Sequence, residues 1–351
     1  MSAAALGDDR LQRARLAHLG LASALSIMFI ASLSVGATDV SLWTVASKVL
    51  SGEQLTLLEH TVFFDIRLPR TALGVVVGAG LAVSGVLMQG LFRNPLADPG
   101  LVGVSAGATF GAVAAIVLGG MLPVAVSTWV GAALIPTAAF VGAWVSMTVL
   151  YRVATRNGRT SVATMLLGGI AIGALVMAAV GMMVYVADDL QLRELTFWQL
   201  GSLTGASWPK LVFAMPAILI ACGVGYYLAH GLNGLSLGEA TAGHMGVNVQ
   251  ALKRVTILAT AAATGAAVAV SGGIGFVGIV VPHLLRLATG PDHRPLLLNA
   301  ALLGGALLLG ADMIARVIVA PAELPIGIIT ALLGAPVFLW ILLRNRAIVD
   351  L

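Results

Sequence analysis

The chain has 351 residues, of which 59% are hydrophobic and 10% charged, with 42 glycines and a formal net charge of +4. A single soluble core cannot hide that much apolar surface, so composition excludes a soluble globular domain and indicates a packed bundle of membrane helices. The basic residues form no stripe that alternates with aromatic residues, so no nucleic acid is expected as a partner. The single cysteine, Cys222, excludes a disulfide framework and a thiolate metal site, and no His, Cys, Asp and Glu grouping has metal-ligand spacing.

The N-terminal segment has basic residues before an apolar run from Leu16 to Gly36. This pattern superficially matches a signal peptide, with cleavage before Thr38 as the alternative. The run of about 21 residues is nevertheless long enough to cross the hydrocarbon core of a bilayer. We therefore expect a retained first membrane helix.

Hydropathy along the whole chain predicts an all-α, polytopic membrane protein with about ten transmembrane helices in one domain, 1–351. The helices are expected near 16–36, 70–91, 100–119, 123–151, 162–187, 211–229, 254–272, 274–289, 296–318 and 324–343. The stretch 274–289 is short and contains Pro282, so we expect a kinked or half-crossing helix there.

The distribution of lysine and arginine predicts the orientation of these helices. With the N-terminus inside, the inner loops carry 13 of the 19 basic residues and the outer loops the remaining 6. Because cytoplasmic loops are enriched in Lys and Arg, both termini are expected in the cytoplasm. Arg67, Arg70 and Arg316 then lie at the outer ends of helices.

Two segments share an A-V-S-G core, Ala82–Gly85 and Ala269–Gly272. In the predicted topology they run in opposite directions, which is typical of inverted-topology repeats in transporters. We expect a first repeat at about 70–187 and a second at about 254–343, with chance similarity between two Gly/Ala-rich helices as the alternative. Segments interrupted by Gly and Pro, such as FRNPLADPGLVG, favour a transporter, because broken backbone at membrane depth needs a polar cavity or protein cover.

The source of energy is predicted to lie outside this chain. Asp312 and His283 are the main titratable candidates within the spans, so an ion-coupled secondary carrier is disfavoured. The sequence has no phosphate-binding Gly loop followed by Lys and no convergent nucleophile, base or metal site, so we expect no enzymatic activity and ATP hydrolysis by another chain. The polar inner segment at about 233–252 offers a cytoplasmic surface that a separate ATPase chain can bind.

The segment LSLGEATAGHMGVNVQALKR resembles the coupling-helix region of the ABC importer permeases for vitamin B12, ferric siderophores and haem. Five motifs match the same family in the same order: RLPR (67–70), GVLMQGLFRNPLADPGLVGVSAGA (85–108), GGIGFVGIVVPHLLR (272–286), DHR (292–294) and AELPIGIITALLGAPVFLW (322–340). The resemblance covers nearly the whole chain after the first helix. It implies a ten-helix protomer in a bacterial inner membrane, a homodimer in membrane lipid, two cytoplasmic ATPase subunits that bind ATP, and a periplasmic binding protein.

The outer arginines are candidates for docking that binding protein. A guanidinium pair can recognise carboxylates bidentately, and the Leu-Pro between Arg67 and Arg70 is expected to point both outward; ordinary anchoring of a helix end is the alternative. The resemblance to the vitamin B12 permease implies that Arg67, Arg70 and Arg316 receive acidic residues of the binding protein. Asp312 lies four residues before Arg316 and can instead pair with it.

The coupling segment is expected to contain a short helix from Glu239 to Gly246 that seats in a groove of the ATPase. Glu239, Ala240, Gly243 and Gly246 are the candidate coupling residues, and a solvated connector is the alternative.

The translocation path carries weaker signals. The resemblance implies a cytoplasmic constriction at Asn94 and Leu96 and a second at the start of the fifth helix, where Val162 and Ala163 replace hydroxylated residues of the vitamin B12 permease. A polar gate there is therefore in doubt, and Ser161 keeps part of the role.

Methionines in the fifth helix, with Met177 and Met183 as path candidates, form an adaptable apolar wall suited to a flat porphyrin, with simple packing as the alternative. The outer loop 195–208 resembles haem and siderophore permeases more than the vitamin B12 permease. We therefore expect haem as the transported cargo, with a ferric siderophore or vitamin B12 as alternatives, and no cofactor bound by this chain. A lone histidine such as His60 is not expected to bind iron.

Overall fold

A computed structural model describes residues 3–36, 38, 40–123, 125, 128 and 130–344. Within these residues, eight helices are long and apolar enough to cross a membrane, and two shorter apolar helices lie near the C-terminal end of the chain. The predicted all-α, polytopic class is confirmed. The helix predicted at 274–289 is indeed short, spans Val277–Thr289 and contains Pro282.

The helices are α1 (Ala3–Ser34), α2 (Leu42–Ser51), α3 (Leu57–His60), α4 (Leu68–Phe92), α5 (Val104–Leu118), α7 (Leu134–Ala154), α8 (Val162–Val186), α9 (Asp189–Gln199), α10 (Trp208–Ser236), α11 (Glu239–His244), α12 (Val249–Ser271), α13 (Val277–Thr289), α14 (His293–Val317) and α15 (Ile326–Arg344). A π-helical turn, Thr61–Arg67, leads into α4, and short 3-10 turns cover Pro99–Val102, Gly119–Met121 and Gly131–Ala133. A two-stranded antiparallel hairpin, β1 (Thr155–Arg156) and β2 (Arg159–Thr160), joins α7 to α8.

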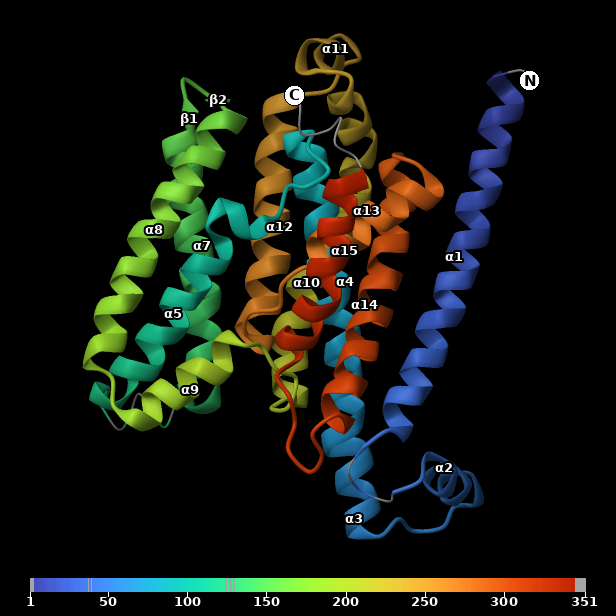
Figure 1. Ribbon diagram of the computed structural model, residues 1–351, viewed down its shortest axis with the longest axis vertical. Helices are drawn as coiled ribbons and strands as arrows, with labels where there is room; N and C mark the ends of the chain where they lie inside the picture. The colour runs from blue at the N-terminus through green and yellow to red at the C-terminus, as the bar shows by residue number, and fades with distance from the viewer. Residues whose placement is uncertain are drawn as a thin grey trace.

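Helix α4 is the centre of the bundle. Most of its side chains are buried, and it packs against α10, α12, α13 and α14 (Figure 1). Two glycines permit this packing: Gly78 faces the backbone of Gly304, and Gly85 faces the carbonyl of Gly278. A Cβ atom at either position would overlap backbone, so the helix axes could not approach as closely.

Helices of one predicted repeat pack on helices of the other. The first helix of each segment packs on the third helix of the other, α4 on α14 and α12 on α7, and the two first helices also contact each other. An inverted repeat would produce this pattern, because a pseudo-two-fold axis pairs equivalent elements. The repeat boundaries at 70–187 and 254–343 stay a prediction.

Several boundaries differ from the hydropathy prediction. The span expected at 123–151 corresponds to α7, which begins only at Leu134, directly after the 3-10 turn Gly131–Ala133, and extends to Ala154. Residues 124, 126, 127 and 129 of the expected span lie outside the described residues. The span expected at 211–229 is the longer α10, whose end at Ser236 takes up the start of the segment expected at 233–252. Hydropathy does not detect α2, α3 or α9, because they are short and α9 is rich in polar residues.

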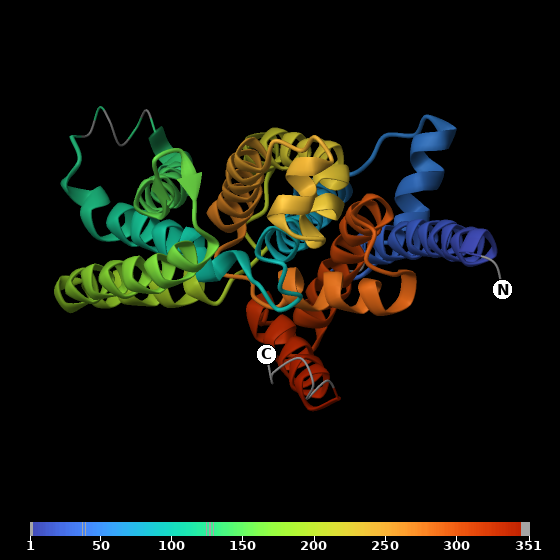
Figure 2. The same cartoon turned by 90° about the horizontal axis from the view of Figure 1, so that it is seen from above.

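Different short elements lie at the two ends of the bundle. The N-terminal end of α1, the C-terminal end of α15, α11 and the β1–β2 hairpin lie at one end, and α2 and α3 lie at the other (Figure 1). Seen along the bundle in Figure 2, α8 and α15 lie at its margin rather than in its centre. Because α1 begins and α15 ends at the same end of the bundle, the arrangement agrees with an even number of crossings.

Candidate functional site

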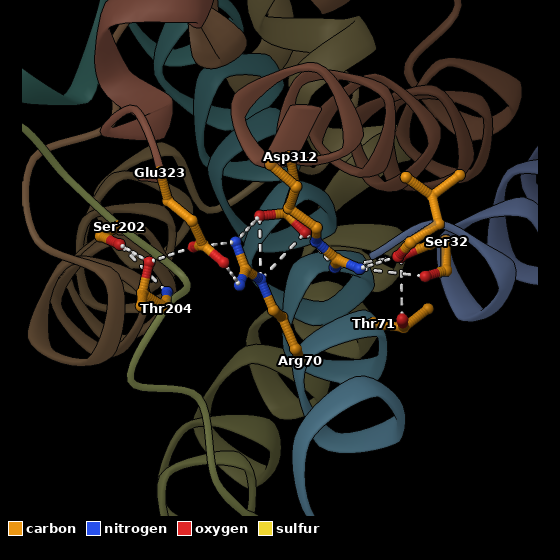
Figure 3. A network of polar contacts seen from close by, with 9 residues as sticks. Ser32, Arg70, Thr71, Ser202, Thr204, Asp312 and Glu323 are labelled. Carbon is orange, nitrogen blue, oxygen red and sulfur yellow. Dashed lines mark hydrogen bonds and ion pairs between the residues drawn. The ribbon is translucent and has the colours of Figure 1, made fainter. Parts of the chain in front are cut away.

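A buried ionic network (Figure 3) joins the start of α4 to the last turns of α14, at the end of the bundle that carries α2 and α3 (Figure 1). Arg70 in the first turns of α4 donates from Nε and Nη2 to Asp312 of α14 at 2.8–3.2 Å, and from Nη1 to Glu323 at 3.0 Å. Arg316 pairs with the same Asp312 from the next turn of α14. Two cations therefore face two anions, and a buried network of this kind is stable only when its charges are balanced in this way.

Hydroxyl and carbonyl groups extend the network on both sides. Arg316 donates to the carbonyl oxygens of Ser32 and Val35 at the end of α1, at 3.0 and 3.1 Å. On the other side, Thr204 donates to Glu323 at 2.7 Å. The network thereby ties α1, α4, α14 and the loop after α9 together.

Arg67 has a separate set of acceptors. Its guanidinium donates to the carbonyl oxygens of Leu33, Thr38 and Val40 at 2.8–2.9 Å, and to the Thr38 hydroxyl at 3.2 Å. These groups belong to the end of α1 and the turn that follows it. Arg67 therefore fastens that turn to the start of α4 through backbone acceptors.

The expectation that Arg67 and Arg70 point outward is wrong for this structure, since their exposed fractions are 3% and 6%. Arg316 is likewise buried, and its anticipated pairing with Asp312 is present. The physical reason is that Asp312, Glu323 and free carbonyl groups lie within reach, and an ionised side chain at a helix end prefers such partners to a partly desolvated surface. A role of these arginines in docking the binding protein stays a prediction. It requires that an arginine exchange one of its present acceptors for an acidic residue of the binding protein.

Sequence reasoning missed Glu323, whose side chain is the most exposed of the four charged groups in the network. Burial alone raises its pKa, but hydrogen bonds from Arg70 and Thr204 outweigh burial, and the pKa of Glu323 ends below its usual value of 4.5. Glu323 is therefore ionised at neutral pH. The available signal was an isolated acidic residue inside the otherwise apolar motif AELPIGIITALLG.

At the opposite end of the bundle, α11 forms the short helix expected from the sequence, although it ends at His244 and not at Gly246. Ala242 is buried against α10, whereas Ala240 and Gly243 are exposed. Gly246 follows with φ = +83°, a left-handed conformation that reverses the chain toward α12. The helix therefore presents a protruding outer face on a base that is packed against the bundle.

Glu239 opens α11 and accepts a hydrogen bond from Lys253 Nζ of α12 at 2.7 Å. Lys253 also donates to the carbonyl of Thr160 at 2.9 Å. The role of Glu239, Ala240, Gly243 and Gly246 in contacting an ATPase stays a prediction.

Three of the candidate path residues lie outside the helix interiors, in the loop after α4 and at the start of α8. Asn94 is exposed and Leu96 half-buried in the loop after α4, where the Asn94 side chain accepts a hydrogen bond from the Leu96 amide at 2.9 Å. Ser161 is the N-cap of α8 and accepts from the Thr164 amide at 3.2 Å. Further into the bundle, a cavity of about 310 Å³ lies between α4, α12 and the chain before α13, and Asp98 and Thr264 are among its lining residues.

The methionines of α8 do not form one wall. Met165 is buried in the core, and Met183 packs in a small cluster with Val113 and Leu195. Met177 is 49% exposed, on a helix whose apolar face is largely uncovered in this single chain. Met165 therefore cannot line a path. Met183 packs against other helices, which agrees better with the packing role considered from the sequence than with a wall of the path.

No group of three or more His, Cys, Asp or Glu side chains within the described part of the chain can hold a metal ion. His60 lies in α3 and reaches Asp65 at 3.6 Å, an exposed pair. His283 is buried in α13, and neither of its ring nitrogens has a hydrogen-bond partner among the described residues.

The bundle of apolar helices, the broken helices and the protruding α11 define a multi-pass membrane transport subunit. The chain matches the FecCD transport family over residues 24–344 and belongs to this family. It is 45% identical to the hemin transport system permease protein HmuU of Yersinia pestis over 91% of this chain and 94% of that protein. It is 45% identical to the cobalamin import system permease protein BtuC of Halobacterium salinarum, over 81% of this chain and 73% of that protein.

A solved structure of a metal-chelate type ABC transporter in an inward-facing conformation matches with a TM-score of 0.81 and 33% identity, over 93% of this chain and 98% of that chain. The resemblance to this importer family is thus confirmed. The chain is a permease subunit of an ABC importer and not an enzyme, and ATP is hydrolysed by a partner ATPase.

Proposed function

We propose that this permease carries haem from a periplasmic binding protein into the cytoplasm. The observation that carries the proposal is the 45% identity to the hemin permease of Yersinia pestis over nearly the full length of both chains. The cobalamin permease of Halobacterium salinarum reaches the same identity over smaller shares of the two chains. A ferric siderophore and vitamin B12 are the alternative cargoes.

The working unit is a homodimer in the bacterial inner membrane, with two cytoplasmic ATPase subunits, one periplasmic binding protein and both termini in the cytoplasm. The apolar face of α8 supports pairing, because Leu167, Ile170 and Leu175 are 64–73% exposed in the single chain. A second permease or membrane lipid covers this face. The outer surface of α11 supports contact with the ATPase.

Docking of the binding protein proceeds by partner exchange at Arg70. The Glu323 side chain is 31% exposed and shares Arg70 with Asp312, so an incoming carboxylate can replace Glu323 without leaving the guanidinium unpaired. Arg67 and Arg316 contribute by holding the adjacent turn after α1 in place, because both donate to carbonyl oxygens there.

The test is transport by proteoliposomes that contain the permease, its cognate ATPase and binding protein, with haem, a ferric siderophore and cobalamin assayed side by side. We expect ATP-dependent uptake of haem only. A complex whose ATPase cannot hydrolyse ATP is the matched control, and an ionophore removes ion gradients. Uptake of a siderophore or cobalamin instead would overturn haem as cargo, and uptake that follows ion gradients would overturn the ABC mechanism.

A further inference from the structure

Lys253 is a buried lysine that joins three elements at the end of the bundle carrying α11. Its side chain is 3% exposed, and Nζ donates to Glu239 of α11 at 2.7 Å and to the carbonyl of Thr160 at 2.9 Å. Gln250, one turn earlier in α12, accepts from the amide of the same Thr160 at 2.9 Å. We call Glu239, Gln250, Lys253 and Thr160 the Lys253 clamp.

Thr160 is the last residue of β2 and directly precedes Ser161, the N-cap of α8. Both of its backbone polar groups are therefore held by side chains of α12, and the residue itself is 4% exposed. A displacement of α12 near Lys253 must move the start of α8 or break these two bonds. The clamp thus connects the base of α11 to the N-terminus of the helix that opens with Ser161.

Packing alone does not require a lysine at this position. A buried ammonium loses its hydration, and an apolar side chain of similar volume would fill the site without that cost. Lysine instead provides donors for two acceptors on different elements, α11 and β2, which no apolar side chain can bind. Lys253 is therefore present to connect α11 with β2 and not to fill space in the core.

We propose that Lys253 is a positioning residue that transmits displacement of α11 to the start of α8, and so couples ATP hydrolysis to the opening of the path. This inference rests on the proposed function of α11 as the contact with the ATPase. The connection is direct because one buried ammonium group binds both elements, the carboxylate of Glu239 at 2.7 Å and the carbonyl of Thr160 at 2.9 Å. Without the clamp, we expect ATP hydrolysis to continue while the translocation path opens less often.

The experiment measures cargo transported per ATP hydrolysed in the full complex in proteoliposomes, using whichever of haem, cobalamin and ferric siderophore the wild-type complex carries. Lys253→Met is expected to lower this ratio by about fivefold or more, with ATPase activity per assembled complex retained. Lys253→Arg keeps donors for both acceptors and is expected to restore most of the ratio. Arg254→Met, at the exposed neighbouring position, removes the same charge outside the clamp and is expected to leave the ratio unchanged.

Glu239→Gln covers the case in which Lys253→Met does not assemble, because the Glu239 side chain is 43% exposed and tolerates substitution. It is expected to lower the ratio by about twofold or more, and Glu239→Gln combined with Lys253→Met is expected to be no worse than Lys253→Met alone, since linked residues are not additive.

An unchanged ratio in Glu239→Gln or Lys253→Met, or additive losses in the double variant, would overturn the clamp. A proportional fall of transport and hydrolysis would mean a merely structural role and would overturn it as well. Absence of ATP-dependent transport by the wild-type complex would instead contradict the proposed function, so the two failures are distinguishable.

Discussion

Arg67 and Arg70 stand three residues apart, yet one binds carbonyl oxygens of the turn after α1 and the other binds carboxylates. Their position between a π-helical turn and the first turns of α4 explains the difference, because their side chains point to different neighbours. Arg67 completes a turn of the backbone, and Arg70 shares Asp312 with Arg316 and Glu323 with Thr204. The two arginines are expected to respond differently to substitution.

Arg67→Lys is expected to lower the free energy of unfolding by about 1–3 kcal/mol, because a lysine cannot reach the three carbonyl groups with the planar fork of a guanidinium. Thermal unfolding of the permease in nanodiscs measures the effect. Arg93→Lys, at an exposed position, is the matched control and should leave the melting temperature unchanged. Equal melting temperatures for Arg67→Lys and wild type would contradict this role.

Glu323→Gln is expected to make the stability of the protein less dependent on pH in the acidic range. The pKa of Glu323 is lowered in the folded state, so its stabilising contribution is complete above its usual pKa of 4.5 and is lost as the pH falls through the lower folded value. The difference in melting temperature between wild type and variant should therefore be largest at pH 6–7 and shrink below about pH 4.5. A difference that grows on acidification would show that the sign is wrong.

At the scale of elements, close helix packing and backbone reversal depend on particular glycines. Gly85→Ala in α4 is expected to cost about 1–3 kcal/mol or more, because its Cβ would overlap the carbonyl of Gly278 in α13. Gly173→Ala in α8 is the control: apart from the backbone of its own helix and its chain neighbours, no atom lies within 4 Å of the added Cβ, and alanine favours the helix by about 1 kcal/mol. Unfolding in nanodiscs should separate the two variants, and equal stability would contradict the packing argument.

The segment after α11 offers a second matched pair. A Cβ atom added to Gly243 or to Gly246 would have no neighbouring atom within 4 Å, but only Gly246 has a positive φ, +83°. A left-handed conformation costs an L-residue about 1–2 kcal/mol, and β-branching adds to this cost. Gly246→Val should therefore destabilise the segment after α11 and lower the melting temperature in nanodiscs, whereas Gly243→Val, which has no positive φ to adopt, should lower it less. Equal melting temperatures for the two variants would show that the backbone reversal does not need a glycine.

At the scale of the whole molecule, the ionic network lies at the end of the bundle that carries α2 and α3, and the β1–β2 hairpin with its arginines lies at the other end. The predicted orientation of these two ends in the membrane can be tested directly. In a Cys222→Ala background, a membrane-impermeant maleimide should label Ser51→Cys in intact cells. Arg159→Cys in the β1–β2 hairpin should be labelled only after the membrane is opened, because it belongs to the face enriched in basic residues. Labelling of Arg159→Cys in intact cells would reverse the predicted topology.

The sequence alone determined the class of protein, the approximate spans and the importer family. These properties follow from local composition and from motifs contiguous along the chain, and so do the short Pro-containing helix α13 and the short helix that begins at Glu239. Even the pairing of Arg316 with Asp312 was accessible, since residues four apart lie on one face of a helix.

The tertiary structure decided which groups Arg67, Arg70 and Arg316 bind and how α11 is connected to α8. Arg70 and Asp312 are 242 residues apart, and Lys253 and Thr160 are 93 apart. No periodicity predicts such contacts, because they depend on how closely packed helices place their ends together. The same reason explains Met165: its position in α8 suggested an accessible wall, but neighbouring helices bury it completely. Local pattern thus determines what each segment is, and packing determines which partners its polar groups find.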